Sequence, residues 1–276
     1  MIKALDATQI LLPNALKTEF PAPNNKCGLK IHTMFCLKDN IPEQAIITDA
    51  KLSDIIAAKK NVTFLSGVTY VFDRGYYDFG WWNLINKSGA YFVTRLKKHT
   101  KPTFKRAHSC IFSKNVISDH VVRLERCMSG GRKNPYQQEL RRVVAKNNEG
   151  KEIQIITNDF TSTADEIAAK YSQRWQIELF FKWLKQNLKI KKFYGKSSNA
   201  IKTQVYIALI AYVLLKLLYE SVVTGFDFRT FVNIIKARLL SRMENLWQPF
   251  VSSNRRCSKI SETRQLSLFN WGKSHA

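Results

Sequence analysis

The apolar positions of residues 171–189, YSQRWQIELFFKWLKQNLK, recur with the period of an α-helix. Three or four residues separate Ile177, Phe181, Leu184 and Leu188, so they form one stripe, which predicts packing against a domain core. The opposite face carries side chains at spacings of three, four, four and three: Tyr171, Arg174, Glu178, Lys182 and Lys185. A lone carboxylate among four potential hydrogen-bond donors fits a solvated ion-pair ladder. It equally fits a metal ligand set among groups that bind phosphate.

Short apolar runs alternate with turns and helical segments over the first third of the chain. The pattern predicts strands at 2–6, 27–37, 43–50, 68–73 and 90–96, and helices at 52–60 and 76–89. The strands 2–6 and 68–73 each end at an Asp. This β-β-β-α-β-α-β order predicts an α/β fold in which helices cover a mixed sheet.

The pattern changes at about residue 97. Residues 97–156 read as short, very basic strands with turns at "SGGRKNP" and "NNEG", which predicts a β-rich insertion. Helical periodicity then resumes, with Thr161 or Thr163 as the N-cap before Glu166. Further helices are expected at about 198–223 and 228–245. We therefore divide the chain into 1–96, the insertion 97–156, the remainder of the first domain at 157–224, and a C-terminal helical segment and tail at 225–276.

The charge balance indicates a polyanionic partner. Lys and Arg number 44 against 21 Asp and Glu, which gives a net charge of +23. The basic residues are spread over most of the length, as a long phosphate-binding groove requires. A lipid-binding tract would concentrate them instead, so we expect nucleic acid and no membrane.

The five cysteines and the apolar segments point to a cytoplasmic protein. Cys27, Cys36, Cys110, Cys127 and Cys257 form no metal-binding pattern, and their odd number without a signal peptide suggests reduced thiols in packed positions. The most apolar stretch, 205–218, is too short in its uninterrupted run to span a bilayer, so we interpret it as a buried core helix.

Three carboxylates can meet at one rim of the predicted sheet. Asp6 and Asp73 close two strands, and Glu178 stands on the cationic helix face. Three such groups can hold two divalent ions about 3.5–4 Å apart for attack at a phosphodiester. Mg²⁺ suits them because it prefers oxygen ligands and needs neither His nor Cys.

Each element of this hypothesis also has a structural explanation. An Asp that closes a strand is often a turn residue or a helix cap, and a charged helix face is often simply solvated. The combination of all three on a strongly basic chain favours the metal-dependent site.

Several separated motifs resemble those of one family. "YSQRWQIELFFKWLK" has a Tyr, an Arg three residues on, a Glu four further and a Lys seven further, and resembles the signature of the insertion-sequence-4 family of bacterial DDE transposases. In the expected order, "LDATQI" resembles the first catalytic segment, "GLKIH" the Lys-x-His strand, "TDAKLSD" the following segment, "VFDRGY" the second catalytic segment and "IITND" the strand before the signature helix. The resemblance covers residues 1–220.

The resemblance implies a ribonuclease-H-like catalytic domain, mixed in its sheet and interrupted by a β-rich insertion. It implies that Asp6, Asp73 and Glu178 bind two Mg²⁺ or Mn²⁺ ions. Tyr171, Arg174, Lys182 and Lys185 would contact the transposon end, and so would Lys30 and His32 by their motif. The implied activity is cut-and-paste DNA transposition through a hairpin on the transposon end, by a homodimer on double-stranded DNA in the cytoplasm, at the nucleoid.

Some residues near these motifs keep a second interpretation. His32 also fits a hydrogen-bonded structural histidine, and Lys30 also fits a surface position. Asp54 competes with Asp73 as a ligand, but it lies near a predicted helix start, where capping explains it. Trp175 and Trp183 are expected in the core.

Two departures from the family pattern bear on activity. Family members usually carry an end-recognition domain ahead of the first Asp, whereas Asp6 follows Met1 by only five residues. The insertion of the family often uses a Trp to stack on a flipped base, and here the available rings are Phe104, Phe112 and Tyr136.

Three functional hypotheses follow. The first is a metal-dependent DNA transposase. The second is a catalytically inactive, N-terminally truncated DNA-binding remnant, and the third is a two-metal nuclease that hydrolyses DNA without strand transfer.

Overall fold

The structure is a computed structural model of the chain. It describes residues 1–276 with the exception of 109–114, 125–133, 147–149, 188–192, 223–224 and 240–276. In chain order the described elements are β1 (Ile2–Leu11), η1 (Asn14–Leu16), β2 (Gly28–Cys36), β3 (Ile41–Asp49), α1 (Asp54–Asn61), β4 (Thr69–Phe72), η2 (Arg74–Tyr76), α2 (Phe79–Lys87), β5 (Tyr91–Arg95), β6 (Thr103–Ala107), β7 (Val116–Arg123), β8 (Leu140–Lys146), β9 (Glu152–Thr157), α3 (Ala164–Gln173), α4 (Trp175–Asn187), α5 (Ser198–Ser221) and α6 (Phe228–Arg238).

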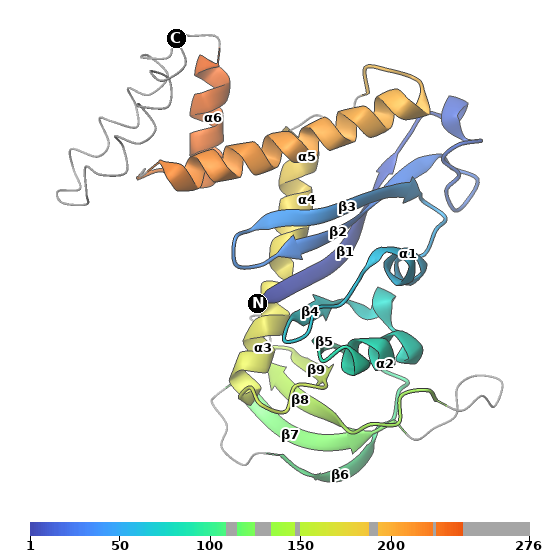
Figure 1. Cartoon of the computed structure of the whole chain (residues 1–276), viewed down its shortest axis with the longest axis vertical. Coiled ribbons are helices and arrows are strands. Elements are labelled where there is room, and N and C mark those ends of the chain that lie inside the picture. The colour runs from blue at the N-terminus through green and yellow to red at the C-terminus, as the bar shows by residue number, and fades with distance from the viewer. Residues whose placement is uncertain (109–114, 125–133, 147–149, 188–192, 223–224, 240–276) are drawn as a thin grey trace. The chain divides into compact units, whose positions relative to one another are not determined.

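The chain forms two compact units, Met1–Tyr206 and Ile207–Ala276. The first unit is built on a nine-stranded sheet in the order β3-β2-β1-β4-β5-β9-β8-β7-β6 (Figure 1). Strands β1, β4 and β5 run parallel, and the remaining neighbours pair antiparallel. The predicted mixed α/β sheet is therefore confirmed.

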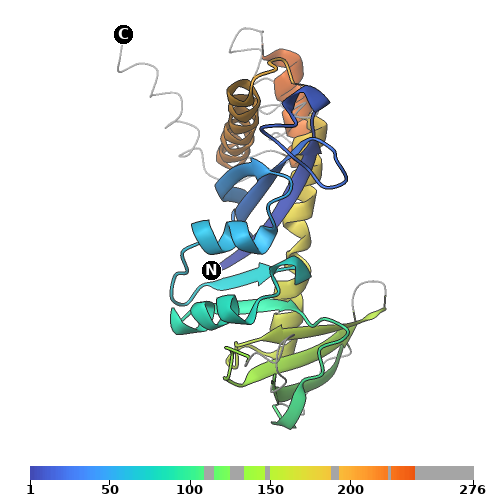
Figure 2. The same ribbon diagram turned by 90° about the vertical axis from the view of Figure 1, so that its right-hand side faces the viewer.

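Helices lie on both faces of this sheet, and the strands alternate accordingly. Tyr70 and Phe72 of β4 belong to the core that packs around α1 and α2, whereas Val71 belongs to the core with Ala164 and Ile167 of α3. Figure 2 shows α1 and α2 on the side of the sheet opposite α3 and α4. Because side chains alternate along a strand, a single residue step decides which set of helices a side chain meets.

The basic segment between β5 and α3 extends the same sheet. Strands β6 to β9 lie within it, and β9 pairs with β5, so the insertion continues the row of strands. The predicted β-rich character is confirmed, while the predicted turns at 129–135 and 147–150 fall largely outside the described residues.

A buried ion pair ties the insertion to the start of α3. The guanidinium of Arg141, which is 1% exposed, donates to both oxygens of the fully buried Asp119 at 2.9 and 2.7 Å. The same guanidinium donates to the backbone oxygens of Asp159 and Ser162. Both carboxylate oxygens of Asp119 and most N–H groups of Arg141 therefore have hydrogen-bond partners, as buried charges require.

The helix predicted from residue 163 onward begins as expected and then divides. Thr163 is the N-cap of α3, and its hydroxyl and the Glu166 carboxylate complete a capping box. The prediction of one continuous helix was wrong, because α3 ends at Gln173 and α4 begins at Trp175. At the junction, the Arg174 N–H donates to the Tyr171 oxygen and the Ile177 N–H donates to the Arg174 oxygen. Both bonds join residues three positions apart, as in a 3₁₀ turn, and not four apart as in an α-helix.

The second unit contains the greater part of α5 and all of α6. Rings of Tyr212 and Tyr219 on α5 pack edge-to-face with Phe228 at the start of α6. Among the described residues, α5 is long and apolar enough to cross a membrane by length and composition alone, a test that core helices also meet. The expected core helix is buried on one side only, since Ile207, Ile210, Leu214 and Leu217 are exposed. The predicted end of the next helix at 245 and the tail lie beyond the described residues.

The buried pair of Arg141 and Asp119 should dominate the stability of the insertion. Replacing Arg141 by Met leaves a buried carboxylate without its cation, so we expect the free energy of unfolding to fall by about 3–5 kcal/mol in urea titrations. A double change, Arg141→Met with Asp119→Leu, should recover most of that loss.

The matched control is Arg106→Met. Arg106 makes an equally bidentate pair with Glu139, but on the exposed edge strand β6. Solvent screens that pair, so the control should barely change stability. Equal losses in the two single variants would contradict the role of the buried pair.

Candidate active site

Asp6 lies within β1 and not at its end. The strand was predicted to finish at Asp6, but it continues to Leu11 because residues 3–11 pair with β2 along their whole length. The parallel neighbour β4 stops earlier, at Phe72, which faces Leu5. Asp6 is therefore the first residue of β1 that has lost its neighbour on that side, and Leu5 faces α1 and α2 while Asp6 faces the other way.

Asp73 follows β4 directly, one step beyond the Leu5 and Phe72 pair. Its side chain is the N-cap of η2, and its Oδ1 accepts a hydrogen bond of 2.8 Å from the Gly75 N–H. The Thr94 hydroxyl donates to the Asp73 backbone oxygen at 3.3 Å. The parallel register thus brings two aspartates together at the same edge, although 67 positions separate them in the printed sequence (73 minus 6).

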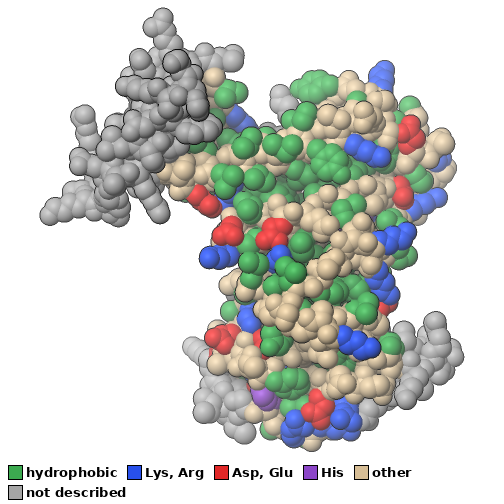
Figure 3. All heavy atoms as spheres, viewed as in Figure 1, with side chains coloured by type: hydrophobic (Ala, Val, Ile, Leu, Met, Phe, Trp, Pro, Cys, Tyr) green, Lys and Arg blue, Asp and Glu red, His purple; other side chains and the backbone are tan. Residues whose placement is uncertain are grey.

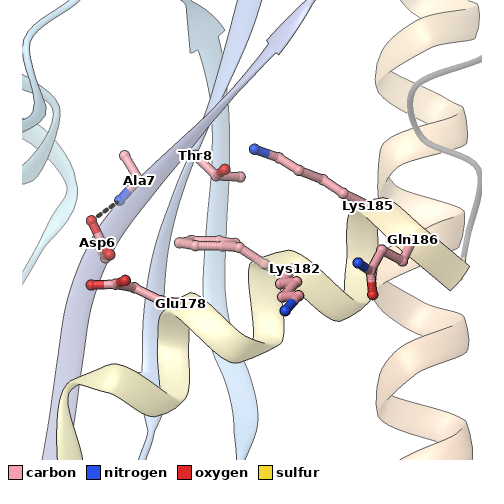
Figure 4. Close-up of a pocket in the computed structure, with 8 residues that line it drawn as sticks. Asp6, Ala7, Thr8, Glu178, Lys182, Lys185 and Gln186 are labelled. Carbon is pink, nitrogen blue, oxygen red and sulfur yellow. Dashed lines mark hydrogen bonds between the residues drawn. The ribbon is translucent and has the colours of Figure 1, made fainter. Parts of the chain in front are cut away.

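Glu178 reaches this edge from α4. The apolar stripe of that helix is buried as predicted at Ile177, Phe181 and Leu184, while Leu188 lies outside the described residues. Glu178 directly follows Ile177, so it lies about 100° around the helix from the stripe and not on the opposite face as predicted. Figure 4 shows its carboxylate facing that of Asp6 on β1.

The guanidinium of Arg174 lies between these two carboxylates. One nitrogen is 2.5 Å from Glu178 Oε1 and another is 3.5 Å from Asp6 Oδ2. The same guanidinium lies 5.9 Å from the centre of the Tyr171 ring. The structure therefore brings Tyr171, Arg174 and Glu178 into one group with Asp6.

Burial affects the Asp6 carboxyl more strongly than the positive charge next to it does. Burial raises the pKa of Asp6 to about 7, although the hydrogen bond from the Ala7 N–H and the charge of Arg174 lower it. The carboxylates of Asp73 and Glu178 raise it further. A desolvated carboxyl beside two others is an environment that a bound cation would stabilise.

A hollow of roughly 460 Å³ opens beside these acids. It is lined by both acidic and basic side chains, together with Phe181: Asp6, Ala7, Thr8, Glu178, Lys182, Lys185 and Gln186 (Figure 4). Two of the predicted DNA contacts, Lys182 and Lys185, thus border the same hollow as two of the predicted ligands. Thr8 and Gln186 had not been singled out from the sequence, although Thr8 belongs to the "LDATQI" motif.

The chain matches a family model described as "Transposase DDE domain" over residues 1–214. It belongs to the DDE transposases. It is 38% identical over 224 residues to a putative transposase, y4zB, of Sinorhizobium fredii (strain NBRC 101917 / NGR234), a match that covers 79% of the chain and 60% of that relative. It is also 28% identical over 225 residues to a probable transposase for the insertion sequence element IS5377 of Geobacillus stearothermophilus, over 79% of the chain and 57% of that protein.

A third relative is a putative transposase for the insertion sequence element IS4SA of Synechocystis sp. (strain ATCC 27184 / PCC 6803 / Kazusa), 33% identical over 155 residues. That match covers 54% of the chain and 40% of the relative. The chain therefore spans at most 60% of the length of these curated relatives. The resemblance seen in the motifs is confirmed at the level of the transposase family.

Among solved structures, the chain is similar to piggyBac transposase in a synaptic complex with hairpin DNA. The TM-score is 0.48 at 12% sequence identity, over 96% of this chain and 56% of that one. At this level the likeness adds nothing to the family match.

The remaining DNA contacts predicted for this transposase domain are largely buried. The Lys30 side chain is 16% exposed and that of His32 is 8% exposed. The Lys30 ammonium donates to the Leu52 oxygen at 2.7 Å, and His32 Nε2 lies 2.9 Å from the Thr48 hydroxyl. Both side chains approach Asp54, not the hollow.

The predicted metal ligands do not form a closed cluster in the described part of the chain. Within the described ranges, no three His, Cys, Asp or Glu side chains lie close enough together to hold an ion as they stand. The guanidinium of Arg174 already bridges Asp6 and Glu178, so it occupies the position that a metal ion bound by these two carboxylates would take. The donor set fits Mg²⁺ or Mn²⁺, because it offers only carboxylate oxygens and because the buried, charged form of Asp6 is disfavoured without a cation.

The aromatic residues of this domain differ in their exposure. Tyr136 is only 1% exposed, which excludes it as a stacking platform in this fold, and Phe112 is outside the described residues. Phe104 on β6 is 58% exposed. Figure 3 shows Lys and Arg side chains at the lower end of the molecule, where Figure 1 places β6. Trp175 was expected in the core and is exposed instead, because it points away from the apolar stripe of α4.

The position of Arg174 yields a prediction. Replacing Arg174 by Gln leaves Asp6 and Glu178 facing each other without a cation, so we expect the metal-free chain to lose about 1–3 kcal/mol of stability. Because Mn²⁺ would then meet no competing guanidinium, adding it should raise the melting temperature of the variant more than that of the parent chain. Thermal unfolding with chelator and with Mn²⁺ measures both effects.

The control is Arg106→Gln, which breaks an ion pair far along the sheet at β6. Its response to Mn²⁺ should equal that of the parent chain. If Arg174→Gln also responded like the parent, the guanidinium and the ion would not compete for the same carboxylates.

Proposed function

We propose that the chain carries the catalytic domain of a DNA transposase that cleaves phosphodiester bonds and joins DNA strands with the help of divalent metal ions. The observation that carries the proposal is that Asp6 and Glu178 face each other across Arg174, while Asp73, at the end of β4, is near enough to raise the pKa of Asp6. Family membership supports the same reaction class.

Asp6, Asp73 and Glu178 would hold two Mg²⁺ or Mn²⁺ ions. When bound, such a pair supplies an activated water or 3′-hydroxyl and stabilises the leaving oxygen. The chain contributes the fixed carboxylates, the partial exclusion of water around Asp6 and a cation, Arg174, that keeps the acids in place before the ions arrive.

Tyr171, Arg174, Lys182 and Lys185 would contact the DNA backbone. Their support is their position on one side of α3 and α4, with both lysines lining the hollow. Arginine and lysine neutralise phosphate, and tyrosine can donate a hydrogen bond to it. Lys30 and His32 stay predicted contacts, and their burial favours an indirect role.

The partners proposed for the whole protein are double-stranded DNA at the transposon ends and at the target, and a second copy of the chain on that DNA. The excess of 44 Lys and Arg over 21 Asp and Glu supports a polyanionic partner. We place the protein in the cytoplasm, at the nucleoid.

The three acids give the sharpest test. We expect Asp6→Asn, Asp73→Asn and Glu178→Gln each to reduce Mn²⁺-dependent cleavage and joining by at least about a thousandfold, because two-metal chemistry needs every ligand. The substrate is DNA that carries the native ends flanking the gene, and products are separated on denaturing gels. Binding of the same DNA should change by less than about threefold.

The outcomes separate the alternatives. Normal cutting by one of the variants would remove that residue from the catalytic set. Binding without cutting by the parent chain, with the native ends and both metals tested, would identify the inactive remnant. Cleaved but never joined products would identify a nuclease.

The DNA contacts give a second test, in salt. We expect affinity to fall steeply as salt rises, on the order of a thousandfold or more between about 50 and 200 mM, because many phosphates release counterions. Lys182→Gln and Lys185→Gln should each reduce the slope of log affinity against log salt by about 1. The control Lys59→Gln alters a lysine that already pairs with Asp78, at 2.7 Å, and should leave the slope unchanged. A flat salt dependence would contradict a nucleic-acid role.

A further inference from the structure

Asp54 is the first residue of α1, but its side chain does not cap that helix. The N-cap position is Ser53, which makes no side-chain capping bond, and the Asp54 carboxylate turns back toward β2. The capping explanation offered from the sequence was therefore wrong.

One oxygen of Asp54 forms an ion pair with a lysine of β2 and lies near a histidine of the same strand. Its Oδ1 lies 3.0 Å from the Lys30 ammonium and 3.6 Å from His32 Nδ1. That histidine is more than nine-tenths buried, and its Nδ1 has no hydrogen-bond partner in the described part of the chain. A buried nitrogen without a partner needs an explanation, and its position next to Asp54 indicates that His32 helps to orient that carboxylate.

The other oxygen of Asp54 lies beside Asp73. A Cβ placed on Gly75 would be 2.9 Å from Asp73 Oδ1 and 3.6 Å from Asp54 Oδ2, so both oxygens border the same small space. The buried Tyr76 is in the field of the same acids: burial raises its pKa, and Asp54, Asp6 and Asp73 raise it further. Asp54 belongs to α1 and Glu178 to α4, and these two helices lie on opposite faces of the sheet (Figure 2).

A cation between the two aspartates would offset the repulsion of their charges. The Lys30 ammonium pairs with Oδ1 of Asp54, whereas Oδ2 is the oxygen that borders the space shared with Asp73. A ligating carboxylate normally has one oxygen on the metal and the other held by a neighbouring donor. On Asp54 the neighbouring group is the Lys30 ammonium, which forms an ion pair with Oδ1 at 3.0 Å, although Oδ1 accepts no hydrogen bond in the described part of the chain.

We propose that Asp54 is a fourth carboxylate of the site, which binds with Asp73, through Oδ2, the divalent ion on the α1 side. Lys30 and His32 are its positioning residues. This inference rests on the proposed function, because it adds a ligand to the same metal site, and it gives the buried Lys-x-His pair a role that needs no direct contact with DNA.

The test is the binding of Mn²⁺ alone to the full chain, followed by the paramagnetic signal of the free ion. Asp54→Asn should weaken binding at one ion at least about tenfold, as Asp73→Asn should. The matched control is Asp39→Asn, an exposed aspartate on the turn between β2 and β3, which should bind like the parent chain.

Two further measurements keep the test decisive if Asp54→Asn unfolds. The double variant Lys30→Met with Asp54→Asn removes the buried cation together with its counter-ion, and it should show the same loss of Mn²⁺ affinity. In the parent chain, Fe²⁺ with ascorbate and peroxide should cut the backbone next to Asp54 as well as next to Asp73.

The outcomes distinguish this inference from the function beneath it. If Asp73→Asn and Asp6→Asn lose Mn²⁺ while the Asp54 variants keep parental affinity, Asp54 is only the counter-ion of Lys30 and the inference is overturned. The absence of iron-dependent cuts next to Asp54 would overturn it as well. If neither Asp6→Asn nor Asp73→Asn changes Mn²⁺ binding, the proposed function fails too.

Discussion

The unequal length of two parallel strands is the constraint on which the site depends. Strand β1 runs on to Leu11, while β4 ends at Phe72 against Leu5, and this leaves an open edge that starts at Asp6. The end of β4 sets Asp73 at the same level. An edge without a neighbour gives room for the hollow beside Asp6 and Thr8 and for a helix that approaches from outside the sheet.

The second requirement is that positive charge meets these acids from several directions. Arg174 bridges Asp6 and Glu178, and two lysines, Lys182 and Lys185, border the hollow. Lys30 forms an ion pair with Asp54. Buried carboxylates are tolerated only with such partners. A transposase domain of this kind needs the same balance, because its acids must attract metal ions while its surroundings attract phosphate.

The sequence by itself determined the features that depend on local periodicity. The stripe of Ile177, Phe181 and Leu184 fixed which side of the helix faces the core. The start of α3 was narrowed to Thr161 or Thr163 before Glu166, and the capping box forms at Thr163 within one turn. The order of strands and helices, and the family motifs within them, followed from patterns that reach no further than one element.

Only the tertiary structure decided the features that depend on a neighbour far along the chain. Asp6 lies inside a strand because β2 pairs with it, which no pattern within residues 2–6 can reveal. The helix divides at Arg174, whose guanidinium pairs with Asp6, although no Gly or Pro is nearby in the sequence. Trp175 is exposed because it does not lie on the apolar stripe of α4. Asp54 turns from the helix start toward Lys30 and Asp73, because the strength of a charge interaction is set by distance in space and by burial, and neither is written in the order of the residues.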